Sequence, residues 1–172
     1  MRIFALDLGR KCGFASGTPN SIPLSGIWQF SEGRAIAQME LRNRIHLHWD
    51  KNPPEIVVVE APLPLKAFAR LKTSENSVRM TYGMHAVAEI AALEYDIDFK
   101  EVSADTARKH FIGRANFGNR NDTKREVIRR CHQLGFMKTN ENNDNQADAI
   151  CCWDWGIAHL TRKSPRELHM FP

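Results

Sequence analysis

The order of the apolar segments constrains the fold of this 172-residue chain more than any other feature. Three short strand-like segments come first, at residues 2–8, 14–16 and 24–30, and turn residues separate them. After them, segments with helical spacing alternate with short apolar segments. Consecutive short strands favour an antiparallel meander, whereas strand–helix–strand units bring strands together in parallel. We therefore expect an α/β fold with a mixed five-stranded sheet flanked by helices.

Beyond the meander, helical periodicity and capping residues give the expected positions of the other elements. Ser103 is expected to cap one short helix, and Asp122 or Thr123 to cap the next, which Gly135 ends. The expected elements are a helix at 33–49, a strand at 55–59, a helix at 75–95, a strand at 98–102, and helices at 104–111, 122–134 and 144–161. We expect one domain over residues 1–162 and a C-terminal tail over 163–172.

Composition excludes several classes of protein. An apolar content of 42% and a charged content of 26% are those of a globular chain rather than a disordered one. No apolar stretch approaches the roughly 20 residues that span a bilayer, and the N-terminus has no signal-peptide pattern. The four cysteines lack zinc-ligand spacing and are expected to be reduced and buried. These features predict a cytoplasmic protein that does not bind a membrane.

A net charge of +4 is compatible with two kinds of protein. Lysine and arginine on one surface can bind nucleic acid by displacing its counterions. A soluble basic protein without a polyanionic partner has the same composition. Charge alone leaves these alternatives open.

Two carboxylates follow strands that are otherwise built for burial. Asp7 lies in the first strand segment, and Glu60 follows the run of residues 56–59 at the end of the fourth. A buried, unpaired charge is costly, so each needs a partner such as a cation. The alternative interpretation is a turn-forming Asp and a solvated Glu at the start of a loop.

A second pair of carboxylates opens the last helix. Asp144 and Asp148 lie four residues apart, which stacks them on one helical face. Asp148 lies inside the helix, where Asp is disfavoured and a structural explanation is weak. Asp144 has a strong alternative role as the N-cap of that helix.

The four carboxylates together indicate more than any one of them. Clustered carboxylates repel one another unless cations neutralise them, and all-oxygen sites select Mg²⁺ or Mn²⁺ rather than zinc. Two such ions can bind the attacking and leaving oxygens of an in-line phosphoryl displacement. The residues therefore predict a two-metal nuclease or a related phosphoryl-transfer enzyme.

Four short motifs, in this order, resemble those of RuvC-type Holliday junction resolvases in the ribonuclease H-like superfamily. The matching segments are residues 4–9, 57–60, 102–113 with 122–124, and 144–149. The resemblance implies a ribonuclease H-like nuclease domain, Mg²⁺ with Mn²⁺ as a substitute, a homodimer, and paired nicks in four-way DNA junctions. By this resemblance Asp7, Glu60, Asp144 and Asp148 hold the metal and Lys124 is the catalytic lysine.

The chain departs from the family pattern at three places. The first turn is one residue shorter than the commonest form. Asn145 occupies the usual third acidic position, so that either Asp144 supplies the carboxylate, which we expect, or an amide replaces it. Arg108 stands where the family often has a lysine, and because arginine stays protonated it can only bind phosphate.

Basic residues near these motifs are candidates for DNA binding. The candidates are Lys66, Phe68, Arg70, Lys72, Arg108, Arg114 and Arg120. Phe68 lies where resolvases of this family often carry an aromatic residue that probes the junction, and an aromatic ring can stack on a base. A Phe packed in the core among solvated cations is the alternative for Phe68.

Three functions follow from these observations. The first is a structure-selective endonuclease that cuts four-way or other branched DNA. The second is a ribonuclease H-type enzyme that cuts RNA in hybrids. The third is a nucleic-acid-binding member of the same fold without catalysis, against which the four carboxylates and Lys124 argue.

Overall fold

The computed structural model describes residues 1–64, 66, 68 and 73–160. A five-stranded sheet in the order β3-β2-β1-β4-β5 forms its centre. Its strands are β1 (Ile3–Asp7), β2 (Lys11–Gly17), β3 (Leu24–Gln29), β4 (Ile56–Glu60) and β5 (Asp98–Val102). The first three strands pair antiparallel, whereas β1, β4 and β5 run parallel. The expected mixed sheet, with a meander followed by parallel strands, is confirmed.

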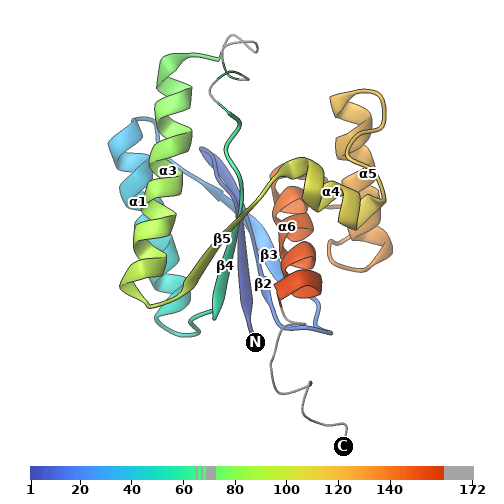
Figure 1. Cartoon of the computed structure of the whole chain (residues 1–172), viewed down its shortest axis with the longest axis horizontal. Coiled ribbons are helices and arrows are strands. Elements are labelled where there is room, and N and C mark those ends of the chain that lie inside the picture. Colours follow the sequence, from blue (N-terminus) through green and yellow to red (C-terminus); the bar gives the residue numbers. More distant parts are fainter. Residues whose placement is uncertain (65, 67, 69–72, 161–172) are drawn as a thin grey trace, which may run out of the picture.

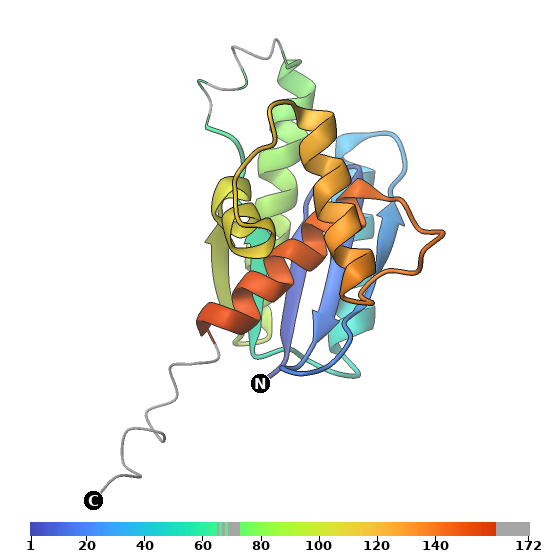
Figure 2. The same cartoon turned by 90° about the vertical axis from the view of Figure 1, so that its right-hand side faces the viewer.

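Helices cover both faces of this sheet (Figure 1). On one face lie α1 (Arg34–Trp49) and α3 (Glu75–Glu94). On the other lie α4 (Ala104–Ile112), α5 (Arg120–Gln133) and α6 (Asp144–Leu160). Figure 2 shows α6 lying across the sheet, with α5 on the side of α6 that faces away from the sheet. None of the described helices is long and apolar enough to span a membrane.

Alternation along the central strands divides the interior into two cores. In β1, Phe4 and Leu6 pack against α1 and α3, whereas Ile3 and Ala5 pack against α6. The same alternation in β4 sends Val57 and Val59 to the first core and Ile56 and Val58 to the second. Both strands are covered on both faces, which explains their nearly continuous apolar sequences. The four cysteines are buried free thiols, as expected.

Two glycines allow α6 to lie very close to the sheet. A Cβ atom on Gly13 of β2 would lie 1.8 Å from the backbone oxygen of Asn145 at the start of α6. A Cβ on Gly156, near the other end of α6, would lie 3.0 Å from the Val58 side chain and 3.2 Å from Ile3. Backbone therefore touches backbone at Gly13, which fixes where α6 begins relative to β1 and β2.

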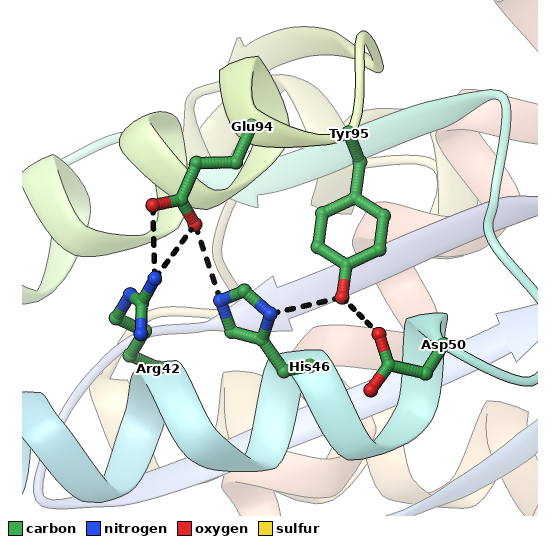
Figure 3. Close-up of polar contacts among 5 residues, drawn as sticks. All are labelled: Arg42, His46, Asp50, Glu94 and Tyr95. Carbon is green, nitrogen blue, oxygen red and sulfur yellow. Dashed lines mark hydrogen bonds and ion pairs between the residues drawn. The ribbon is translucent and has the colours of Figure 1, made fainter.

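On the face of the sheet that α6 does not cover, a polar network joins α1 to the end of α3 (Figure 3). The Nη2 atom of Arg42 lies 2.9 and 3.2 Å from the two carboxylate oxygens of Glu94. His46 lies between Glu94, at 3.1 Å, and the Tyr95 hydroxyl, at 2.9 Å. Tyr95 in turn donates a hydrogen bond to Asp50. The hydrogen bond from Arg42 is the main reason that the pKa of Glu94 is lowered.

Helix caps are only partly as expected. Ser103 caps α4, and its hydroxyl accepts a hydrogen bond from the Thr106 amide. The expected cap of α5 at Asp122 or Thr123 is wrong, because α5 begins at Arg120 and Asn119 caps it. Gly135, with φ of 70°, follows the end of α5 as expected. The expected tail at 163–172 lies outside the described residues.

Candidate active site

Asp7 and Glu60 lie next to each other at the carboxyl ends of two parallel strands. Leu6 of β1 pairs with Val59 of β4, so the next residues along are Asp7 and Glu60. Alternation gives Asp7 the same side as Ile3 and Ala5, and it gives Glu60 the same side as Val58. Both carboxylates therefore lie on the α6 face of the sheet, at the edge where sites in α/β sheets usually form.

Asp148 of α6 joins the two strand carboxylates from the facing layer. It is buried, with 8% of its surface exposed. Burial raises the pKa of Asp7 well above its usual value, and repulsion from Glu60 and Asp148 raises it further. Burial, followed by repulsion from Asp148, raises the pKa of Glu60 from 4.5 to about 7. The three carboxylates therefore form one electrostatic cluster.

The start of α6 resolves part of the ambiguity about Asp144. Asn143 is the N-cap, because its side-chain oxygen accepts a hydrogen bond from the Gln146 amide at 3.1 Å and its backbone oxygen accepts one from Ala147. The N-cap interpretation of Asp144 is therefore wrong. Asp144 is instead in the first turn of the helix, and its carboxylate pairs with Lys124.

Cations from α4 and α5 surround the cluster. The Nη2 atom of Arg108 lies 3.1 and 3.3 Å from the two carboxylate oxygens of Asp148. The Lys124 ammonium pairs with Asp144. Arg120, at the start of α5, lowers the pKa of Glu60, as Arg108 and Lys124 also do. These cations only partly offset the burial and repulsion, since the pKa values of both strand carboxylates remain raised.

The chemistry of this donor set fits a hard divalent cation. Carboxylate oxygens are the ligands that Mg²⁺ and Mn²⁺ prefer, and a buried, mutually repelling cluster gains stability from such an ion. Within the described part of the chain, no three His, Cys, Asp or Glu side chains already form a group that could hold a metal. The carboxylates are present on one face, but cationic side chains occupy two of them.

A small cavity adjoins the cluster between α4, α5 and the loop that connects them. Its volume is about 320 Å³, and its charged lining residues are the three cations Arg108, Arg120 and Lys124 and one carboxylate, Asp105. The buried Thr123 hydroxyl holds the loop, because it accepts a hydrogen bond from the Phe117 amide and donates one to the Asn119 carbonyl.

The other expected DNA-binding residues differ in where the structure places them. Arg114 is exposed, and its guanidinium stacks 4.5 Å above the Phe117 ring. Lys66 is exposed. Phe68 is only 8% exposed and packs against Tyr82, with ring centres 6.1 Å apart, which agrees with the packed interpretation. Arg70 and Lys72 lie outside the described residues.

His85 was missed by the sequence-based reasoning. It is buried on α3, and its Nε2 atom lies 2.9 Å from the backbone oxygen of Glu60. Its Nδ1 atom lies 2.9 Å from the Thr81 oxygen, one turn earlier in the same helix. His85 thus ties the backbone at the end of β4 to α3. A lone histidine in an Ala-rich helix gives no sequence signal for such a contact.

Solved structures with the same architecture are resolvases of Holliday junctions. Thermus thermophilus RuvC in complex with a Holliday junction substrate superposes with a TM-score of 0.70 at 14% identity, over 95% of this chain and 96% of that one. Fowlpox virus resolvase, in complex with junction DNA, gives a TM-score of 0.55 at 14% identity over 93% and 99% of the two chains. The yeast mitochondrial Holliday junction resolvase gives 0.53 at 12% identity over 93% and 81%.

These likenesses establish a RuvC-like, ribonuclease H-like fold for the chain. No protein-family sequence model and no curated protein sequence matches it. The fold implied by the sequence motifs is thus confirmed by structural similarity at identities of 12–15%.

Proposed function

We propose that this chain is a divalent-metal-dependent endonuclease that cuts four-way or other branched DNA. The observation that carries the proposal is the cluster of Asp7, Glu60 and Asp148 at one edge of the sheet, with raised pKa values for both strand carboxylates. Maintaining this cluster costs stability, and strongly perturbed carboxylates of this kind mark functional sites. The RuvC-like fold and the basic cavity beside the cluster favour a nucleic-acid substrate.

The residues of the cluster divide into metal ligands and phosphate-binding groups. Asp7, Glu60, Asp148 and Asp144 would hold Mg²⁺, or Mn²⁺ in its place. When bound, these ions supply charge stabilisation for in-line displacement at a phosphodiester. Lys124 brings an ammonium to the same edge, where it can neutralise charge on the reacting phosphate. Arg108, Arg114 and Arg120 bind the phosphates of the DNA backbone, as do Lys66, Arg70 and Lys72.

A homodimer is part of the proposal. A four-way junction has two-fold symmetry, so paired nicks require two sites related by a two-fold axis. The exposed side of α3 offers apolar surface for a second copy, because Ile90 is 54% exposed and Leu93 is 80% exposed. The two neighbours solved with Holliday junction DNA support branched DNA as the substrate.

The test compares three substrates under one set of conditions. The chain is incubated with Mg²⁺ and a four-way junction, a linear duplex or an RNA–DNA hybrid, each also in excess chelator. We expect Mg²⁺-dependent cleavage of the junction, with paired nicks. Asp7→Asn is the control, because it removes a ligand charge from a nearly isosteric side chain. It should bind the junction and lose cleavage by more than about 100-fold.

The two alternative functions predict different products. Preferential cleavage of the RNA strand in the hybrid indicates a ribonuclease H-type enzyme. Junction binding without cleavage under any metal condition indicates a non-catalytic member of the fold. Full activity in chelator contradicts the metal assignment.

A further inference from the structure

Arg108 pairs with Asp148, one of the proposed metal ligands, through the oxygens that a metal ion would need. Its Nη2 atom is within hydrogen-bond distance of both oxygens of Asp148, at 3.1 and 3.3 Å. The side chains of the pair are only 20% and 11% exposed. A divalent ion needs a carboxylate oxygen at roughly 2.0–2.6 Å. The guanidinium competes with such an ion for the oxygens of Asp148, and its positive charge repels the ion.

The same arginine is not fully satisfied in this position. Its Nε atom is buried and has no hydrogen-bond partner. Buried donors are normally paired. An arginine with a purely structural role usually pairs its Nε atom as well as its two terminal nitrogens. Arg108 also lines the cavity between α4 and α5, where three cations, completed by Arg120 and Lys124, outnumber one carboxylate, Asp105. An anion in that cavity would give the guanidinium a second set of acceptors close to its present place.

We propose that Arg108 is a lock on the metal site, which competes with the divalent cation for Asp148 and is released toward a DNA phosphate in the adjacent cavity. This inference rests on the proposed function in two respects, because it treats Asp148 as a metal ligand and DNA as the source of the phosphate. It explains why the carboxylates lie on one face although, among the described residues, no three His, Cys, Asp or Glu side chains are placed to hold a metal ion. Without DNA, Arg108 stays paired with Asp148, and the divalent cation binds weakly.

The lock has two thermodynamic consequences of opposite sign. Removal of the Arg108 charge leaves Asp148 buried and unpaired in the metal-free protein, which destabilises the fold. The same removal frees both oxygens of Asp148 and makes the site more negative, which strengthens binding of a divalent cation. A structural ion pair whose aspartate does not hold the metal predicts the first effect and only the weak, long-range part of the second.

The experiment measures Mn²⁺ binding and thermal stability in parallel. Mn²⁺ alone is titrated into the wild type, Arg108→Gln and Lys109→Gln, by calorimetry or by electron paramagnetic resonance of the free ion. Lys109 is the matched control, since it is the next residue on α4, carries the same charge and is exposed. We expect Arg108→Gln to bind Mn²⁺ about tenfold more tightly, because a repelling charge is removed, and to melt at a lower temperature in chelator. Lys109→Gln should change neither value appreciably.

The possible outcomes distinguish this inference from the proposed function. Unchanged or weaker Mn²⁺ binding by a folded Arg108→Gln overturns the lock and leaves the nuclease proposal standing. Absence of Mn²⁺ binding by all three proteins overturns both. If Arg108→Gln does not fold, Arg108→Lys replaces it, and its single ammonium should hold Asp148 less well and bind Mn²⁺ more tightly than wild type. Equal affinity of that variant and wild type contradicts the lock.

Discussion

The two faces of the sheet treat the same kind of side chain in opposite ways. On the α1 and α3 face, Glu94 accepts from Arg42 and His46, and its pKa is lowered. On the α6 face, burial and Asp148 raise the pKa of Glu60 from 4.5 to about 7. One glutamate is stabilised in its charged form by its surroundings, and the other is destabilised. The charge of Glu94 therefore helps to join α1 and α3, whereas the charge of Glu60 lowers the stability of the fold.

The difference supports the proposal that the α6 face carries the active site. Both faces are equally apolar in β1 and β4 up to the last residue of each strand. They differ only where the strands end, at Asp7 and Glu60. A polar network such as that around Glu94, whose carboxylate lies within ion-pair distance of Arg42 and His46, has a structural explanation. The carboxylates of Asp7, Glu60 and Asp148 repel one another despite three nearby cations, and such a cluster is typical of a site that binds a further cation.

Gly13→Ala should have the largest effect, since it forces the start of α6, which carries Asp144 and Asp148, away from the sheet. Its Cβ would lie 1.8 Å from the Asn145 oxygen, so α6 must move away. Overpacking against backbone is expected to cost about 3 kcal/mol of unfolding free energy, measured by denaturant titration. Gly9→Ala is the control, because its nearest contact would be an ordinary 3.5 Å. A stable Gly13→Ala with intact cleavage would contradict the tight seating of α6.

Glu60→Gln tests the electrostatic cost directly. In chelator, the folded state holds a proton on Glu60 between pH 4.5 and about 7 that the unfolded state releases, so stability falls as pH rises through this range. At about 1.4 kcal/mol per pH unit, the loss approaches about 3 kcal/mol by neutral pH. The variant should therefore be more stable than wild type above pH 7, and the advantage should vanish near pH 4.5. An equal pH dependence of the two proteins would contradict the strained cluster.

Asp144→Asn and Asn145→Ala sharpen the ligand assignment at the start of α6. Since Asn143 caps the helix, neither substitution should shift the melting temperature much. Asp144→Asn should lower the rate of Mg²⁺-dependent junction cleavage at least about tenfold, while Asn145→Ala should leave it nearly unchanged. The reverse result, a silent Asp144→Asn with an inactive Asn145→Ala, would show that the amide completes the site.

Glu94→Gln is the counterpart of Glu60→Gln on the opposite face, with the smallest expected effect. The substitution removes the negative charge and one of the two acceptor oxygens that face Arg42 and His46, so the melting temperature should fall slightly. Junction cleavage should stay at the wild-type rate. The same chemical change is thus predicted to destabilise one face and stabilise the other. A stabilised Glu94→Gln would remove the contrast on which the comparison depends.

Strong local patterns made most of the fold predictable. The β-branched run before Glu60 predicts a buried strand, and the structure has β4 at Ile56–Glu60. Ser103 is the only good cap before α4, and it is used. Near α5 and α6 the local sequence offers several good caps side by side, and propensity does not choose among them. Asn119 was therefore missed in favour of Asp122 or Thr123, and Asn143 was not considered beside Asp144, for which the cap was the alternative role.

The site was predictable in its acidic residues and not in their partners. Asp7, Glu60 and Asp148 stand out because each follows or interrupts an apolar segment. Contacts such as that of His85 with the Glu60 carbonyl, or of Arg108 with Asp148, join residues 25 and 40 positions apart. Such contacts depend on how helices dock on the sheet, which periodicity alone does not determine.

The alternation of β1 and β4 limits how a chain of this kind can change in length. One residue inserted within β1 before Asp7 would reverse the side chains beyond it and deliver the carboxylate to the α1 face, whereas two inserted residues would return it. Connections such as residues 113–119 can lengthen without turning any carboxylate over. Insertions and deletions should therefore accumulate in the connections, while the strands tolerate only changes that preserve parity.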